Sequence, residues 1–200
     1  MQSVTNLLAL GTAQLGMPYG IANRTGRPDE LLACEIVREA WMGGVRFFDT
    51  ARAYGDSEEV LGRSLAAINA LREARIITKM DPARSLAFEE LRGSLKRTGI
   101  SRLWGVLLHR ETQLDDWEEG IGQSLLKARD EGLVAHLGVS VYAVERALQA
   151  VRLPGIDILQ VAASIFDRRM IRAGVFTRAA EAGKTVFVRS IYLQGLALMD

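Results

Sequence analysis

Short apolar segments alternate along the whole chain with amphipathic segments, and a new apolar segment begins roughly every 30 residues. The apolar segments are continuous, and glycine or polar residues bound them. This pattern is typical of strands that are buried on both faces. The sequence predicts seven strands, at 7–11, 45–50, 75–79, 103–109, 135–140, 156–163 and 185–190.

The segments between these strands have apolar residues at the i, i+3/i+4, i+7 spacing of a helix with one buried face. The first stripe contains Leu32, Ile36, Val37 and Ala40, and the last contains Ile171, Val175 and Ala179. Ser57, which precedes two glutamates, is predicted to cap the start of a helix. Glycines such as Gly99 are predicted to end helices.

Strands that alternate with helices predict a parallel sheet with right-handed helical crossovers. An open doubly wound sheet and a (β/α)8 TIM barrel both fit this order. The segment GTAQLG after the first strand lacks the G-x-G-x-x-G spacing of a dinucleotide-binding turn, which disfavours the doubly wound sheet. We therefore expect residues 1–200 to form a single α/β barrel domain.

A complete (β/α)8 barrel typically needs about 250 residues, and only seven strands are visible before Asp200. We expect a barrel truncated after the seventh strand. On this interpretation the native protein continues by at least one further strand and helix, or a second chain covers the gap.

Composition excludes several classes of partner. The net charge is +1 with no long basic run, so no nucleic-acid partner is expected. No apolar run approaches the roughly 20 residues of a membrane span, and no signal peptide is visible. The single cysteine, Cys34, suits a reducing compartment, so a cytoplasmic protein is expected. The sequence does not determine the oligomeric state.

Function in a parallel β/α fold gathers at the carboxyl ends of the strands. Six of the seven predicted strands end in a polar or ionisable residue, and the first ends in Gly11 and Thr12. The polar residues at the other six ends are Asp49, Lys79, His109, Ser140, Gln160 and Arg189 with Ser190. Singly, each has an ordinary structural explanation, such as an ion pair or a packed histidine. Their coincidence at one rim predicts a site.

Tyr54 follows Asp49 closely, and with Lys79 and His109 these residues form a site that can reduce a carbonyl group if another group supplies hydride. A nearby ammonium is expected to lower the phenol pKa, which is ordinarily about 10. The carboxylate would hold the lysine, and a neutral histidine would orient the substrate oxygen. None of the four can supply hydride, so a bound nicotinamide cofactor is implied. No metal site is expected.

The segments FFDTARAYGDSEEVLG, IITK and GVLLH, in this order, strongly resemble the aldo-keto reductase family. HLGVS and LQVAASIFDRR resemble the next two strand ends, so the likeness covers nearly the whole chain. The resemblance implies a (β/α)8 barrel and a small-molecule carbonyl substrate. It implies the cofactor NADPH, with NADH as an alternative. It also implies a catalytic tetrad of Asp49, Tyr54, Lys79 and His109, with Tyr54 as the general acid.

The candidate cofactor contacts are the polar strand ends and the glycine-containing loop SIYLQG after the last strand. These residues are Gly11, Thr12, Asp49, Ser140, Gln160, Arg189, Ser190, Gln194 and Gly195.

The sequence departs from the family pattern in two of these regions. Val141 stands where many members have an asparagine that helps to hold the nicotinamide carboxamide, so that contact rests on Ser140 and Gln160. Arg189 stands where many members stack a tyrosine on the nicotinamide, and its guanidinium plane can stack on a ring as well. GTAQLGMPYGIANRTG and VRSIYLQG resemble a subgroup associated with sugar or polysaccharide metabolism.

Two other functions fit the same residues. A non-catalytic nicotinamide-binding subunit, regulatory or redox-sensing, can keep the same barrel and tetrad. An unrelated (β/α)8 lyase or isomerase would use Lys79 as a Schiff-base nucleophile. Turnover with a panel of aldehydes separates the first alternative from a reductase, and borohydride trapping tests the second.

Overall fold

The computed structural model describes residues 7–83 and 86–199. Within these residues seven strands form one parallel sheet, in the order β1-β2-β3-β4-β5-β6-β7. Their bounds are Ala9–Gly11, Phe47–Asp49, Arg75–Met80, Leu103–Leu108, Val134–Val141, Ile158–Ala162 and Thr185–Arg189. Every predicted strand is present, although β1 and β2 are shorter than expected. The parallel strand order confirms the predicted α/β barrel type of fold.

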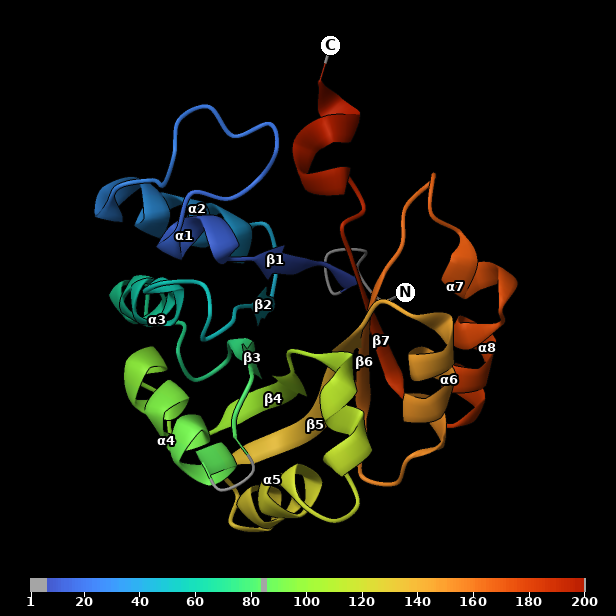
Figure 1. The fold of residues 1–200 in the computed structure, drawn as a ribbon. Coiled ribbons are helices and arrows are strands. Elements are labelled where there is room, and N and C mark those ends of the chain that lie inside the picture. Colours follow the sequence, from blue (N-terminus) through green and yellow to red (C-terminus); the bar gives the residue numbers. More distant parts are fainter. Residues whose placement is uncertain (1–6, 84–85, 200) are drawn as a thin grey trace.

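Helices connect the strands and cover the outside of the curled sheet (Figure 1). They are α1 (Ala13–Gly16), α2 (Glu30–Met42), α3 (Ser57–Ala67), α4 (Ala87–Thr98), α5 (Ile121–Asp130), α6 (Val144–Arg152), α7 (Arg169–Arg172) and α8 (Val175–Glu181). Short 3₁₀ helices cover Glu111–Asp116 and Leu193–Leu198. The predicted last helix is divided into α7 and α8 because Gly174 adopts a left-handed conformation, with φ of 69°.

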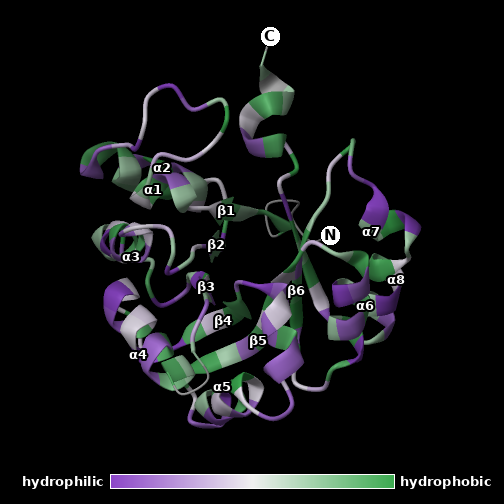
Figure 2. Ribbon diagram, in the orientation of Figure 1, coloured by the Kyte–Doolittle hydropathy of each residue, from purple (hydrophilic) through white to green (hydrophobic). Residues whose placement is uncertain are grey.

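Most of the core lies between the sheet and its helices, where apolar strand residues meet the buried stripe of each helix (Figure 2). A smaller core fills the inside of the curl. There Phe47 of β2 packs edge-on against both Trp104 of β4 and Phe187 of β7, with ring centroids 4.8 and 5.3 Å apart. Because β2 and β7 are far apart in strand order, these contacts show that the sheet is strongly curled, like part of a barrel wall.

β1 and β7 do not pair with each other in the described part of the chain. Apolar residues on the elements beside this opening are exposed, among them Leu8, Leu32 and Ile36. Leu32, Ile36 and Val37 were predicted to face the core, but only Val37 of these three is buried, and α2 buries Ala33 beside it. Among the described elements, the main contact of α2 is with α3. No helix among the described residues is both long and apolar enough to cross a bilayer.

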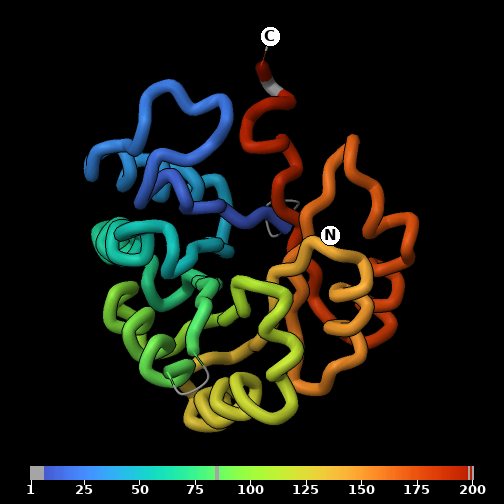
Figure 3. Tube along the Cα trace, in the orientation of Figure 1, coloured from blue at the N-terminus to red at the C-terminus, as the bar shows by residue number. Residues whose placement is uncertain are grey.

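The loop between α1 and α2 and the segment after β7 lie on the same side of the molecule (Figure 3). They touch, because the Ala22 N–H donates to the Gln194 carbonyl at 3.4 Å. This side carries the carboxyl ends of the strands, where the polar residues were predicted to gather.

Candidate active site

The polar strand ends form a second layer above the apolar interior. Side chains in a strand face the same side at every second residue. The interior residues Phe47, Ile77, Leu107, Ile158 and Phe187 are each followed two positions later by a predicted site residue. These site residues are Asp49, Lys79, His109, Gln160 and Arg189. Because of this two-residue periodicity, a layer of polar side chains lies next to the buried apolar layer, at one rim of the sheet.

A cavity of about 910 Å³ opens at this rim. Its lining includes eleven of the predicted site residues, namely Gly11, Thr12, Asp49, Tyr54, Lys79, His109, Ser140, Arg189, Ser190, Gln194 and Gly195. Gln160 is buried and lies outside the lining. The volume is at the upper end of the range for ligand and cofactor sites.

Lys79 and Asp49 form a buried ion pair. The Lys79 side chain is 1% exposed, and its Nζ donates to Asp49 Oδ1 at 2.5 Å and to the Thr50 carbonyl at 3.0 Å. Burial lowers the pKa of Lys79 from its usual value, while the Asp49 carboxylate opposes that change. Sequence reasoning correctly placed the two residues together, since β2 and β3 are neighbours in the sheet.

Tyr54 lies between this ion pair and His109. Lys79 Nζ is 5.2 Å from the centroid of the Tyr54 ring, and the His109 ring meets it edge-on with centroids 5.9 Å apart. Burial, followed by the Asp49 carboxylate, raises the pKa of Tyr54 far above its usual value. The prediction that Lys79 would lower this pKa is therefore wrong for this structure. The cation that acts in the lowering direction is Arg189.

His109 is expected to be neutral at physiological pH, and the structure supports this. Burial lowers the pKa of His109, and the Lys79 ammonium lowers it further. A neutral imidazole can donate one hydrogen bond to a substrate oxygen. The other histidine, His136, lies at the opposite end of the interior, where its ring centroid is 4.5 Å from that of Trp104.

The loop that carries Tyr54 is held against α1 by a close backbone contact. A Cβ at Gly16 would lie 1.8 Å from the Tyr54 carbonyl oxygen. Ser57 strengthens this contact by donating its hydroxyl to the Thr12 carbonyl at 2.7 Å. Ser57 was predicted to be the N-cap of α3, but Asp56 occupies that position and Ser57 is the first helical residue. Its hydroxyl thus joins the ends of β1 and β2 to α3 instead of capping the helix.

Sequence reasoning missed several residues that line the cavity. Gln14, Tyr19 and Asn23 come from α1 and the following loop, and Tyr142 comes directly after β5. The Tyr142 ring packs against the Arg189 guanidinium, whose central carbon is 4.0 Å from the ring centroid. Their positions could have indicated this, because each residue follows a predicted strand end or lies between the first predicted strand and the helix after it.

The loop after β7 has an unusual backbone. Ser190, Leu193 and Gln194 have positive φ values of 61°, 49° and 59°, although none of them is glycine. Such conformations are costly and tend to occur at functional sites. Two buried polar atoms near this region, Gln160 Oε1 and Arg189 Nη2, have no hydrogen-bond partner among the described residues.

The model of the aldo/keto reductase family matches residues 7–198. The 2,5-diketo-D-gluconic acid reductase B of a Corynebacterium strain is 31% identical over 137 residues, covering 62% of this chain and 47% of its own length. The chain spans 42% to 57% of the length of the curated relatives considered.

Solved structures of aldo-keto reductases have a similar fold. A Pseudomonas aeruginosa protein described as an aldo-keto reductase is 29% identical, with a TM-score of 0.80 over 92% of this chain and 73% of its own. A Bombyx mori aldo-keto reductase, solved in complex with NADP, is 24% identical, with a TM-score of 0.74 over 92% of this chain and 62% of its own. Since the family model spans residues 7–198, this chain belongs to the aldo/keto reductase family.

Proposed function

We propose that the protein reduces an aldehyde or ketone to the alcohol, or catalyses the reverse oxidation, with NAD(P)H as the cofactor. The observation that carries this proposal is the arrangement of Asp49, Lys79, Tyr54 and His109 around one cavity. A buried ion pair, a phenol and an imidazole in contact distance make a proton-transfer site for a carbonyl oxygen.

The residues present fit a nicotinamide cofactor. Ser140 lines the cavity and offers a hydroxyl to the carboxamide of a nicotinamide. Arg189 also lines the cavity, and its Nη2 has no hydrogen-bond partner among the described residues. Ser190, Gln194 and Gly195 would hold the phosphates at the loop after β7, the position that β/α barrels use for phosphate. When bound, the cofactor supplies hydride.

In the reductive direction Tyr54 donates its hydroxyl proton to the carbonyl oxygen as the alcohol forms. Its raised pKa keeps the phenol protonated in the ligand-free site. The neutral His109 donates a hydrogen bond to the same oxygen and orients it. Asp49 holds the Lys79 ammonium beside the tyrosine ring. The charge of Arg189 favours the phenolate that proton transfer leaves.

Two observations favour this role of Lys79 over that of a Schiff-base nucleophile. Its Nζ is ion-paired with Asp49 and also donates to the Thr50 carbonyl, so it has no free lone pair in this state.

A polar, sugar-derived carbonyl is the favoured substrate class. The name of the Corynebacterium relative and the resemblance of the loops after β1 and β7 support this choice.

The test is a titration of the full-length protein with NADPH and with NADH, followed by turnover assays with aldehydes that include sugar aldehydes. Binding of either cofactor with quenching or enhancement of its fluorescence is expected, together with substrate-dependent oxidation of that cofactor. Binding without turnover of any carbonyl would favour the non-catalytic subunit. Failure to bind either cofactor would contradict the proposal.

A further inference from the structure

Arg189 carries a positive charge into the cavity without a matching negative charge. Its Nη2 is buried without a hydrogen-bond partner among the described residues, and its Nη1 reaches only the Ser190 hydroxyl, at 3.5 Å. No carboxylate in the described part of the chain forms an ion pair with it. Lys79, by contrast, is neutralised by Asp49. Arg189 is thus an unmatched cation at the carboxyl end of β7.

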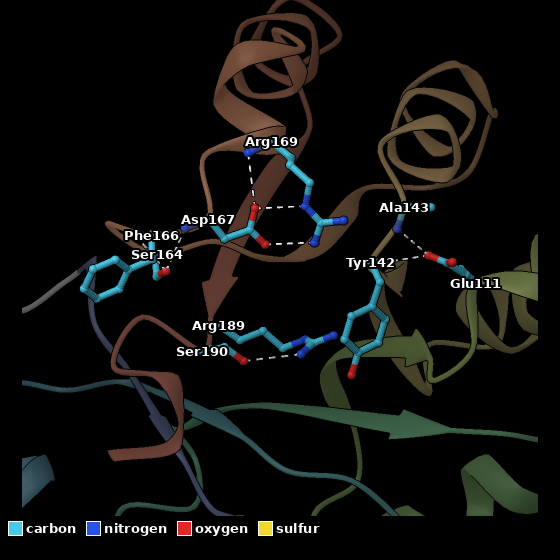
Figure 4. Close-up of polar contacts among 9 residues, drawn as sticks. All are labelled: Glu111, Tyr142, Ala143, Ser164, Phe166, Asp167, Arg169, Arg189 and Ser190. Carbon is cyan, nitrogen blue, oxygen red and sulfur yellow. Dashed lines mark hydrogen bonds and ion pairs between the residues drawn. The ribbon is translucent and has the colours of Figure 1, made fainter. Parts of the chain in front are cut away.

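This guanidinium is fixed in place by its neighbours. Its plane lies against the Tyr142 ring, as Figure 4 shows. The carboxylate of Glu111 holds the loop that carries this tyrosine, accepting from the N–H groups of Tyr142 and Ala143 at 2.7 and 3.0 Å. Stacking on an aromatic face suits arginine and does not occupy its in-plane N–H groups. A charge held this way cannot easily move out to water.

The field of Arg189 reaches the reacting groups. Its charge acts to lower the pKa of Tyr54, of Lys79 and of His109, which line the same cavity. Any ring that exchanges hydride with a carbonyl carbon must lie in contact with that carbon. The carbon in turn lies one bond from the oxygen that Tyr54 protonates. The reacting ring is therefore within the same field.

The two redox forms of the cofactor differ by one positive charge at this ring. The dihydronicotinamide of NAD(P)H is neutral, and the nicotinamide of NAD(P)⁺ is a pyridinium cation. We propose that Arg189 makes this site bind the reduced cofactor more tightly than the oxidised cofactor. The inference rests on the proposed function, because it requires a nicotinamide in the cavity.

The consequence is a difference between the dissociation constants of the two cofactor forms. At an effective dielectric constant of about 20 and a separation of about 8 Å, repulsion between two unit charges changes a Kd by at least about ten-fold.

The experiment measures Kd for NADPH by fluorescence and Kd for NADP⁺ by its competition with NADPH, using the full-length protein. We compare the ratio of the two constants in wild type, Arg189→Met and Arg189→Lys. The ratio of the NADP⁺ constant to the NADPH constant is expected to fall about ten-fold in Arg189→Met. In Arg189→Lys the ratio should stay close to its wild-type value, because the positive charge is kept. Arg24→Met, which removes a second arginine from the cavity lining, should leave the ratio unchanged.

A third ligand distinguishes an effect of Arg189 on the nicotinamide ring from an effect on the phosphates. 2′-Phospho-ADP-ribose has the phosphates of NADP⁺ but no nicotinamide, so its Kd should be the same in wild type and Arg189→Met. Equal weakening of all three ligands would overturn the inference and assign Arg189 to phosphate binding. An unchanged ratio in Arg189→Met would overturn it as well. If wild type binds neither NADPH nor NADP⁺, the proposed function itself fails, and the inference fails with it.

Discussion

The Lys79 ammonium lies over the Tyr54 ring, 5.2 Å from its centroid, and directs its hydrogen bonds to Asp49 and to the Thr50 carbonyl. The lysine is therefore committed to the carboxylate before any ligand arrives, and the phenol keeps its proton. This arrangement suits a proton donor, because the acid form of Tyr54 persists at neutral pH. It also makes the roles of the phenol and of the ion pair separable by mutation.

Replacement of Tyr54 by phenylalanine removes the hydroxyl and keeps the ring between Lys79 and His109. Turnover of a carbonyl substrate should fall by about 10²–10⁴-fold, the usual contribution of general acid catalysis. The Kd for NADPH and the melting temperature should change little. Steady-state kinetics combined with a cofactor titration check this, and near wild-type reduction by the variant would remove Tyr54 from the role of acid.

The Asp49–Lys79 pair is buried, so breaking it from one side should be costly. Asp49→Asn and Lys79→Met each leave a buried charge without its partner, which typically costs about 3–5 kcal/mol. The double variant should lose much less than the sum of the two single variants. Chemical denaturation of all four proteins gives the coupling free energy. Additive losses would mean that the two charges do not depend on each other in the folded protein.

Much of this site could be predicted because strand order and strand periodicity are visible in the sequence. Continuous apolar segments locate the strands, and the polar residue at the end of each, such as Asp49 or His109, then falls at one rim. The contacts of Tyr142 could not be predicted in this way. They depend on how the loop after β5 is held by Glu111, which lies about 30 residues earlier in the chain.

Two other differences between the predictions and the structure also arise from tertiary packing. The sequence places a cation near the Tyr54 phenol but does not say how deeply the phenol is buried, and burial is the largest influence on its pKa. Helical periodicity places Leu32 on the apolar stripe of α2 but cannot show that its side chain is exposed in the described structure. Local patterns predict elements and their order, whereas burial depends on which elements surround them.

The neutral state of His109 makes the stability of the protein depend on pH. The folded-state pKa of His109 lies below the value of about 6.5 that applies in the unfolded chain. Between these two values the unfolded chain binds a proton that the folded chain does not, so the free energy of unfolding falls as pH falls below about 6.5. His109→Gln should flatten this part of the stability profile. An NMR titration that finds a His109 imidazolium above pH 7 in the folded protein would contradict the prediction.

The contact between Gly16 and the Tyr54 loop offers a test of how that loop is positioned. An added Cβ at Gly16 would meet the Tyr54 carbonyl at 1.8 Å and the Ser57 nitrogen at 2.4 Å. These are backbone atoms, so the loop itself must shift. We expect Gly16→Ala to lower stability by about 1–3 kcal/mol. A displacement of about 1 Å can reduce turnover by about 10²-fold, so kcat should fall further than KM rises.

Gly11→Ala is the matched control for stability, because nothing lies within 4 Å of a Cβ at Gly11. Its melting temperature should stay close to that of wild type, while that of Gly16→Ala falls. Gly11 itself lines the cavity, so the control is read by thermal unfolding and not by turnover. If Gly16→Ala has the melting temperature and the kcat of wild type, then the backbone contact with Gly16 does not hold Tyr54 in its reactive position.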